Sequence, residues 1–121
     1  MLMYTVYISI FSGGIVMKFE ELLSLVREKG KGVDVSSTGF LAVQVNITGD
    51  NGGVFYVEVK DGKVNIEPYE YNDRQCAVTI SSDDLVKLMA GKLDAVAAFT
   101  LGKLKVDGDI GKALEFSKLI K

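Results

Sequence analysis

The 121-residue sequence has no histidine, no tryptophan, one cysteine and one proline. Without histidine the chain cannot build a Ser-His or Cys-His catalytic pair. The single cysteine, Cys76, cannot form an internal disulfide, and a structural zinc site is disfavoured because its ligands are cysteine and histidine. One cysteine is typical of a reducing compartment, so we expect a cytoplasmic protein that has no metal and no cofactor.

An excess of charge of either sign is also missing. Lysine and arginine number 14 against 16 acidic residues, which gives a net charge of -2 and a pI near 5.1. Nucleic acids and anionic membranes are bound by clustered cations, so this composition argues against both as partners. The small basic cluster of Lys103, Lys105 and Lys112 is interpreted as a solvated face. The length and the 48% hydrophobic content predict one domain with a normal core.

Residues 1–16 carry no charged side chain. The stretch is shorter than the ~20 residues of a transmembrane helix and lacks the basic start of a signal peptide. Apolar side chains at every second position from Tyr4 to Ile10 indicate a strand. Two interpretations stay open: an extension upstream of a natural start at Met17, or a strand or arm that joins a sheet edge. The edge is that of its own chain or of a second chain, which would make a homodimer. We therefore expect an extension over residues 1–16 and a domain over residues 17–121.

Hydrophobic periodicity predicts the secondary structure of the domain. Apolar residues at helical spacing predict a helix over residues 18–29 that ends at Gly30. Alternation of period two predicts four strands between residues 38 and 81, joined by turns such as Asp61-Gly62. The remaining expected elements are a helix capped by Ser81 or Ser82, a short helical segment over residues 93–99, a strand over residues 101–106 and a last helix capped by Asp109.

This order predicts an α+β fold with a mostly antiparallel sheet covered by helices on one face. Groups that could be catalytic have simpler explanations. Asp83 and Asp84 stand at a helix N-terminus, where carboxylates act as caps. Cys76 lies on an apolar strand face and is expected to be buried. The glycines of residues 102–111 lack the Gly-Lys-Ser/Thr ending of a phosphate loop. We therefore expect no enzyme activity.

Short motifs follow one another closely in the last third of the chain. They are Gly91-Lys92-Leu93, an apolar turn ending in Phe99, Gly102-Lys103-Leu104-Lys105-Val106, and Gly108-Asp109 at the start of the last helix. Together with Asp61-Gly62-Lys63-Val64 and Ser82-Asp83-Asp84-Leu85, this set resembles the sterol carrier protein-2 family of nonspecific lipid carriers over residues 17–121. The resemblance implies a five-stranded sheet with helices on one face, an enclosed apolar tunnel for a lipid tail, and no reaction.

On this interpretation the chain is a lipid-binding and lipid-transport protein that holds a fatty acid, an acyl-CoA or another lipid, with a linear acyl chain preferred over a sterol. Transient membrane contact is left open. The alternative is an accessory interaction or dimerisation module of an enzyme system, with a filled core. Periodicity alone favours a packed core. The tunnel is expected between the sheet and the helices after Ser81, opening near the last helix. Its expected lining is Ile80, Leu85, Leu88, Met89, Phe99, Leu101, Leu104, Ile110, Leu114 and Phe116.

Overall fold

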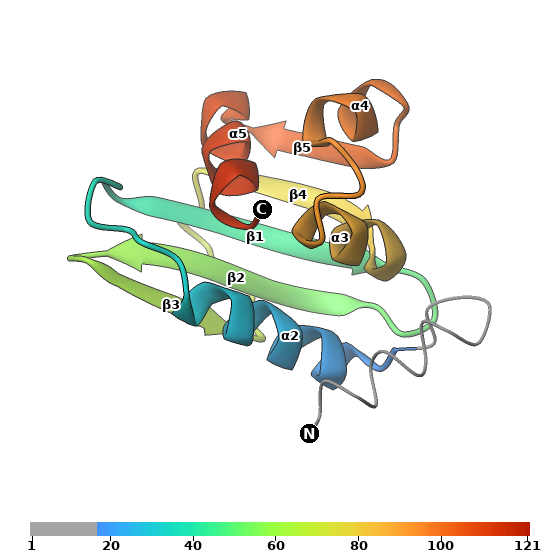
Figure 1. Cartoon of the computed structure of the whole chain (residues 1–121), viewed down its shortest axis with the longest axis horizontal. Coiled ribbons are helices and arrows are strands. Elements are labelled where there is room, and N and C mark those ends of the chain that lie inside the picture. Colours follow the sequence, from blue (N-terminus) through green and yellow to red (C-terminus); the bar gives the residue numbers. More distant parts are fainter. Residues whose placement is uncertain (1–16) are drawn as a thin grey trace.

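A five-stranded sheet with helices on one face forms the protein, as the computed structural model of residues 17–121 shows (Figure 1). The strand order is β3-β2-β1-β4-β5. Every neighbouring pair is antiparallel except the central pair β1–β4, which is parallel. The predicted α+β class and the mostly antiparallel sheet are confirmed. The strands are β1 (Leu41–Thr48), β2 (Gly53–Lys60), β3 (Lys63–Glu67), β4 (Cys76–Ser81) and β5 (Leu104–Gly108).

The helices all lie on the same side of the sheet (Figure 1). Helix α2 packs against β3, α3 against β4, and α4 against β5, while α5 contacts both β1 and β4. No helix within residues 17–121 is both long and apolar enough to cross a membrane. The helices are α2 (Phe19–Lys31), α3 (Ser82–Met89), α4 (Ala95–Thr100) and α5 (Ile110–Leu119).

The first helix runs further than the sequence predicted. We expected it to end at Gly30, but α2 continues through Gly30 to Lys31, and Gly32 is its C-cap. The reason is that Gly30 does not adopt the positive φ with which glycine commonly terminates a helix. The backbone N–H of Gly32 instead donates to the Lys29 carbonyl at 3.2 Å. Gly30 therefore lies inside the helix, facing the sheet.

Two predicted caps are confirmed. The Ser81 hydroxyl accepts a hydrogen bond from the backbone N–H of Asp84 at 3.1 Å, and an Asp109 carboxylate oxygen accepts one from that of Lys112 at 3.1 Å. The fifth strand begins at Leu104 rather than at residue 101. Leu101 is the C-cap of α4, and Gly102 turns the chain with a φ of 77°.

The core lies between the sheet and the helices. Residues at alternate strand positions face the helices, and they include Leu41, Val43 and Val45 of β1, each of which is fully buried. Cys76 is buried among them, as expected. The strand or arm predicted for residues 1–16, and a homodimer built by it, lie outside the described residues.

Candidate functional site

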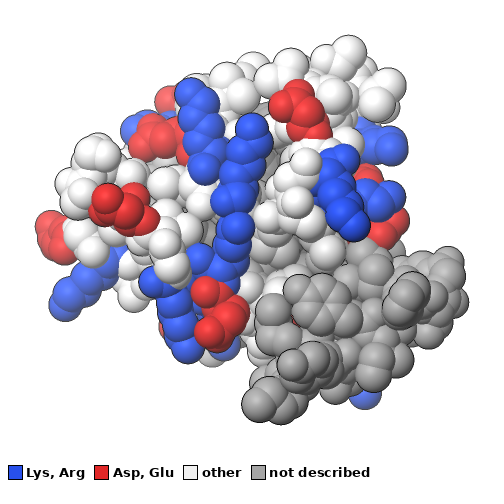
Figure 2. Space-filling view, viewed as in Figure 1, with Lys and Arg blue, Asp and Glu red and all other residues white. Residues whose placement is uncertain are grey.

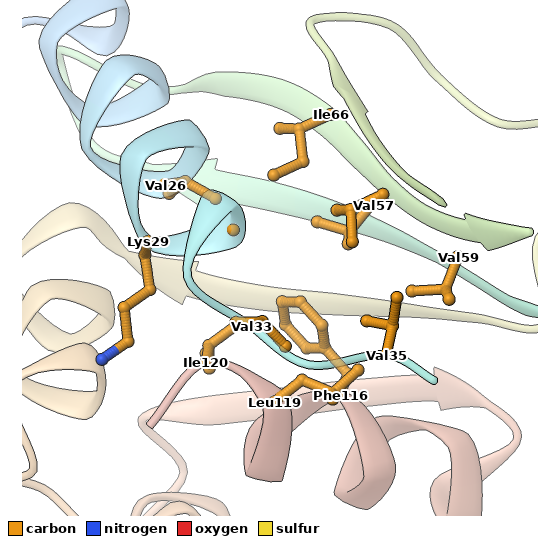
Figure 3. Close-up of a pocket in the computed structure, with 12 residues that line it drawn as sticks. Val26, Lys29, Val33, Val35, Val57, Val59, Ile66, Phe116, Leu119 and Ile120 are labelled. Carbon is orange, nitrogen blue, oxygen red and sulfur yellow. The ribbon is translucent and has the colours of Figure 1, made fainter. Parts of the chain in front are cut away.

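An apolar crevice runs over the helix-bearing face of β2 and β3 (Figure 3). Its accessible lining is entirely apolar, and the volume open to the centre of a water-sized sphere is about 20 Å³. That volume holds about one water molecule, so the walls of the crevice nearly touch. The crevice is lined by Val26, Lys29, Gly30, Val33, Val35, Val57, Val59, Val64, Ile66, Phe116, Leu119 and Ile120.

Four parts of the chain build this crevice. The end of α2 forms one wall, and the irregular segment that follows it brings Val33 and Val35 across the opening (Figure 3). Valine and isoleucine side chains of β2 and β3 form the floor. The last turn of α5 closes the opposite wall with Phe116, and the Lys29 ammonium group points away from the apolar side chains (Figure 3).

Gly30 leaves room in the wall between α2 and β3. A Cβ atom added at Gly30 would lie 3.0 Å from Cδ1 of Ile66 and 3.7 Å from Cγ1 of Val64. Any larger side chain at this position would therefore point into the crevice. The absence of a side chain, rather than a special backbone conformation, is what glycine contributes here.

A wider cleft of about 450 Å³ adjoins the crevice at the edge of the sheet. The two spaces share five lining residues, which are Gly30, Val33, Val35, Val64 and Ile66. The cleft is therefore the mouth of the crevice. It adds polar side chains that the crevice lacks, namely Arg27, Lys31, Asn65 and Glu67.

Arg27 is the cation with the most side-chain hydrogen bonds at this mouth. Its Nε donates to the Ile66 carbonyl at 3.0 Å, and its guanidinium pairs with Glu67 Oε1 at 2.9 Å. Both side chains are nearly half exposed, so solvent weakens the pair. Lys31 makes a longer, exposed contact of 3.4 Å with Glu28. The mouth thus offers two cationic groups whose carboxylate partners a ligand anion could replace.

The other face of the sheet carries a polar network that the sequence did not reveal. The Tyr71 hydroxyl donates to Glu58 at 2.7 Å, and the backbone N–H of Tyr71 donates to the side-chain oxygen of Gln44 at 3.1 Å. The hydrogen bond to Glu58 raises the pKa of Tyr71 to about 12 and lowers the pKa of the Glu58 carboxyl. Tyr56 packs edge-on against Tyr71 at 5.1 Å between ring centroids. This network fastens the β3–β4 loop to the sheet.

The structure divides the predicted lining residues into three groups. One group is buried beneath the helices, a second is partly buried, and a third is exposed to solvent. Phe116 alone among the predicted residues lines the crevice. The buried residues are Ile80, Leu85, Leu88, Met89 and Phe116, Leu104 is partly buried, and Phe99, Leu101, Ile110 and Leu114 are exposed.

Sequence reasoning missed most of the crevice. Val33 and Val35 follow the first helix in a stretch too short to predict a strand, so the sequence analysis assigns no element to them. A glycine after a helical pattern predicts a helix end, which is the expectation for Gly30. Val64 and Ile66 were recognised as an apolar strand face, but nothing in a single strand shows which space that face borders. The usable signal was the Val-x-Val spacing directly after the helix, which indicates an extended segment with one apolar side.

A sequence profile of the SCP-2 sterol transfer family matches residues 16–121. The chain belongs to this family. The resemblance deduced from the motifs is thereby confirmed, and the SCP-2 family is one of lipid-binding and lipid-transfer domains. Among curated proteins, sterol carrier protein 2 of Oryctolagus cuniculus is 32% identical over 102 residues, which is 84% of this chain and 19% of that protein. The chain thus spans about a fifth of the length of this relative.

Solved structures that are similar to this chain have the same fold. Palmitated SCP2L2 from Aedes aegypti matches with a TM-score of 0.66 at 21% identity, covering 86% of this chain and 95% of that one. The sec-alkylsulfatase Pisa1 from Pseudomonas sp. matches with a TM-score of 0.70 at 19% identity, covering 85% of this chain and 16% of that one. At these identities the likeness carries the fold and not the ligand.

Proposed function

We propose that this SCP-2 domain is a non-catalytic carrier that binds one linear acyl chain in the apolar crevice. The observation that carries the proposal is an entirely apolar space that opens through a polar mouth at the sheet edge. Such a combination suits a ligand with a long apolar tail and a polar head. Apolar walls also let chains of different length bind, since they impose few directional contacts.

The crevice has to widen to admit a ligand. Ligand pockets typically enclose roughly 300–1,000 Å³, far more than the space present here. The element best suited to move is α5, because few of its side chains, chiefly Ala113 and Phe116 with Ile120 at its end, are buried. An outward shift of α5 would extend the crevice toward the buried residues after Ser81, the predicted location of the tunnel. Burial then stabilises the complex by about 25 cal/mol per Å² of apolar area, less the cost of association.

The polar mouth favours an anionic head group. Arg27 and Lys31 lie at the opening, where a carboxylate or phosphate would compete with Glu67 and Glu28 for them. A fatty acid or an acyl-CoA has such a head, whereas a sterol offers one hydroxyl. The palmitate named for the Aedes aegypti structure is a ligand of this kind, bound by a protein of the same fold.

Native mass spectrometry of the purified chain tests the proposal. After mild extraction we expect a fraction of the protein to carry one added mass that matches a fatty acid or an acyl derivative. A protein that is empty, and that also fails to bind a fluorescent fatty acid, would contradict the carrier function. The same spectra report whether the added mass is a sterol, which would contradict the preference for a linear chain.

A second function, an accessory module of an enzyme system, is supported by two observations. The crevice is so narrow that it resembles a filled core, and this SCP-2 fold also forms about a sixth of an alkylsulfatase chain. In that case the core would stay closed, and acyl probes would neither bind nor raise the melting temperature. Binding of a fatty acid with a matching rise in melting temperature would exclude a purely structural role.

A further inference from the structure

Exposed apolar side chains are concentrated in one part of the protein. Five of the seven large apolar side chains that are exposed within residues 17–121 fall between residues 96 and 114. We call these five residues the α4–α5 patch. They are Val96, Phe99, Leu101, Ile110 and Leu114, with exposed fractions of 58%, 47%, 67%, 53% and 42%. Clustering of this kind marks an interaction surface more often than chance exposure does.

The patch lies at one end of the molecule. Both α4 and α5 pack on β5, the edge strand of the sheet (Figure 1). Ile110 and Leu114 are one turn apart on the outward side of α5, and Phe99 lies on the exposed side of α4. Leu101 protrudes from the turn between α4 and β5. Figure 2 shows a largely uncharged surface over this end, with an acidic side chain within it and lysine or arginine side chains beside it.

The segment that carries the patch is basic, although the chain is acidic. Residues 91–121 contain six lysines and four acidic residues, whereas residues 1–90 contain eight basic and twelve acidic residues. Lys103 follows Leu101 by two positions, and Lys118 lies one turn beyond Leu114 on α5. Both lysines are exposed, and none of the ion pairs within residues 17–121 includes either of them. The overall charge of -2 conceals this asymmetry.

The four acidic groups of this segment offset only part of the charge of its six lysines. Asp94 and Asp109 accept hydrogen bonds from backbone N–H groups at the starts of α4 and α5. Glu115 pairs with Lys112 at 3.5 Å. Asp107 lies opposite Ala77, on the sheet face that points away from the helices. With six lysines and four acidic residues, this segment carries a formal charge of 6 − 4 = +2, opposite in sign to that of the whole chain.

We propose that the α4–α5 patch docks on an anionic lipid bilayer. Its apolar side chains are exposed on two helices and a turn, and a fluid lipid surface accepts such side chains without a shaped partner. Phe99 and Leu101 insert between head groups, while Lys103 and Lys118 remain at head-group level. Each lysine near an anionic surface strengthens binding about fivefold.

A second copy of the chain fits this surface less well. A symmetric dimer would place the same patch on both sides of the interface. The lysines beside the patch, Lys103 and Lys118, would then be gathered from both copies around one interface, and like charges repel. An anionic membrane instead supplies the opposite charge.

The absence of tryptophan in the chain provides the assay. In the 121-residue chain, Leu101→Trp introduces a single tryptophan at the most exposed position of the patch. We expect its emission to shift to shorter wavelength with vesicles of equal parts phosphatidylcholine and phosphatidylserine. High salt should reverse the shift, and phosphatidylcholine alone should produce little. An absent shift with anionic vesicles, or an equal shift with neutral ones, would overturn the proposal.

Two substitutions in the Leu101→Trp chain locate the surface. Phe99→Ser should weaken vesicle binding about tenfold, since it removes a half-exposed aromatic anchor. The control is Tyr69→Ser, which removes an aromatic side chain that is 64% exposed in the β3–β4 loop. Lys103→Glu should weaken binding about tenfold or more at low salt, and Lys63→Glu on β3 should have a much smaller effect.

Circular dichroism checks that each variant stays folded. If Phe99→Ser binds vesicles as tightly as Tyr69→Ser, another part of the chain carries the binding and the proposal is wrong. Analytical sedimentation tests the competing explanation, which is that the patch binds a second copy of the chain. A parent that is dimeric, and that becomes monomeric on Phe99→Ser without ever binding vesicles, would assign the patch to self-association instead.

Discussion

Replacing Gly30 with leucine should block acyl binding while leaving the fold in place. A Cβ at this position points at Ile66 Cδ1 from 3.0 Å, so the rest of the leucine side chain enters the crevice. The contact is with the mobile end of a side chain, which can rotate away. Gly30 also lies within α2, where leucine is favoured over glycine by up to ~1 kcal/mol. Overpacking costs about 1–3 kcal/mol, so we expect the free energy of unfolding to fall by no more than about 3 kcal/mol.

The effect on binding is larger. A leucine side chain occupies the length of about three to four methylene groups of a ligand chain, and each buried methylene contributes about 0.8 kcal/mol. Excluding them costs about 3 kcal/mol, which raises the Kd roughly a hundredfold. The measurement is displacement of a fluorescent fatty acid, with urea unfolding of the same sample to compare stability.

Gly32→Ala is the matched control for Gly30→Leu. It lies two residues further along the chain, lines neither the crevice nor its mouth, and its added Cβ meets the Lys29 carbonyl at an ordinary 3.8 Å. The control should bind acyl chains like the parent. If Gly30→Leu is folded and binds as tightly as Gly32→Ala, the ligand does not occupy this crevice, and the reasoning is refuted.

Three further predictions follow from other parts of the structure. The raised pKa of Tyr71 stabilises the fold below about pH 10, and this contribution is lost between about pH 10 and 12 as the hydroxyl ionises. The parent should therefore lose stability over that range and Tyr71→Phe should not, as urea unfolding at about pH 9 and 11 would measure. The thiol of Cys76 has a pKa raised to about 11 by burial, so a thiol reagent at neutral pH should label it only after unfolding, and rapid labelling of the native protein would contradict its buried position. Gly108→Ala should lower the free energy of unfolding by roughly 1–3 kcal/mol, because Gly108 has a φ of 99° and an added Cβ would lie 2.8 Å from the Gln75 carbonyl oxygen; an unchanged denaturation midpoint would contradict this.

The sheet could be predicted from the sequence because its signals are local and agree with one another. Strict alternation in β1 and β2, the Asp61-Gly62 turn, and the caps at Ser81 and Asp109 each follow from neighbouring residues. The motif resemblance added the arrangement of helices on one face.

The candidate site could not be predicted in the same way. In α5, two apolar stripes run side by side: Ile110 and Leu114 on one, Ala113 and Phe116 on the other. Periodicity does not say which stripe meets the sheet, and the structure buries the second. Helix α4 has only six residues, too few turns to fix which side of it is buried. The crevice itself depends on how separate segments meet.

The parallel pairing of β1 with β4 determines the order in which the sheet is completed. During synthesis, β1, β2 and β3 emerge first and form an antiparallel meander from neighbouring segments. Strand β1, which lies at the centre of the finished sheet, is then an unprotected edge because β4 is made later. Until β4 arrives, the β4 of another nascent chain can pair there equally well. Crowded expression is therefore expected to produce strand-exchanged aggregates, and slower synthesis to reduce them.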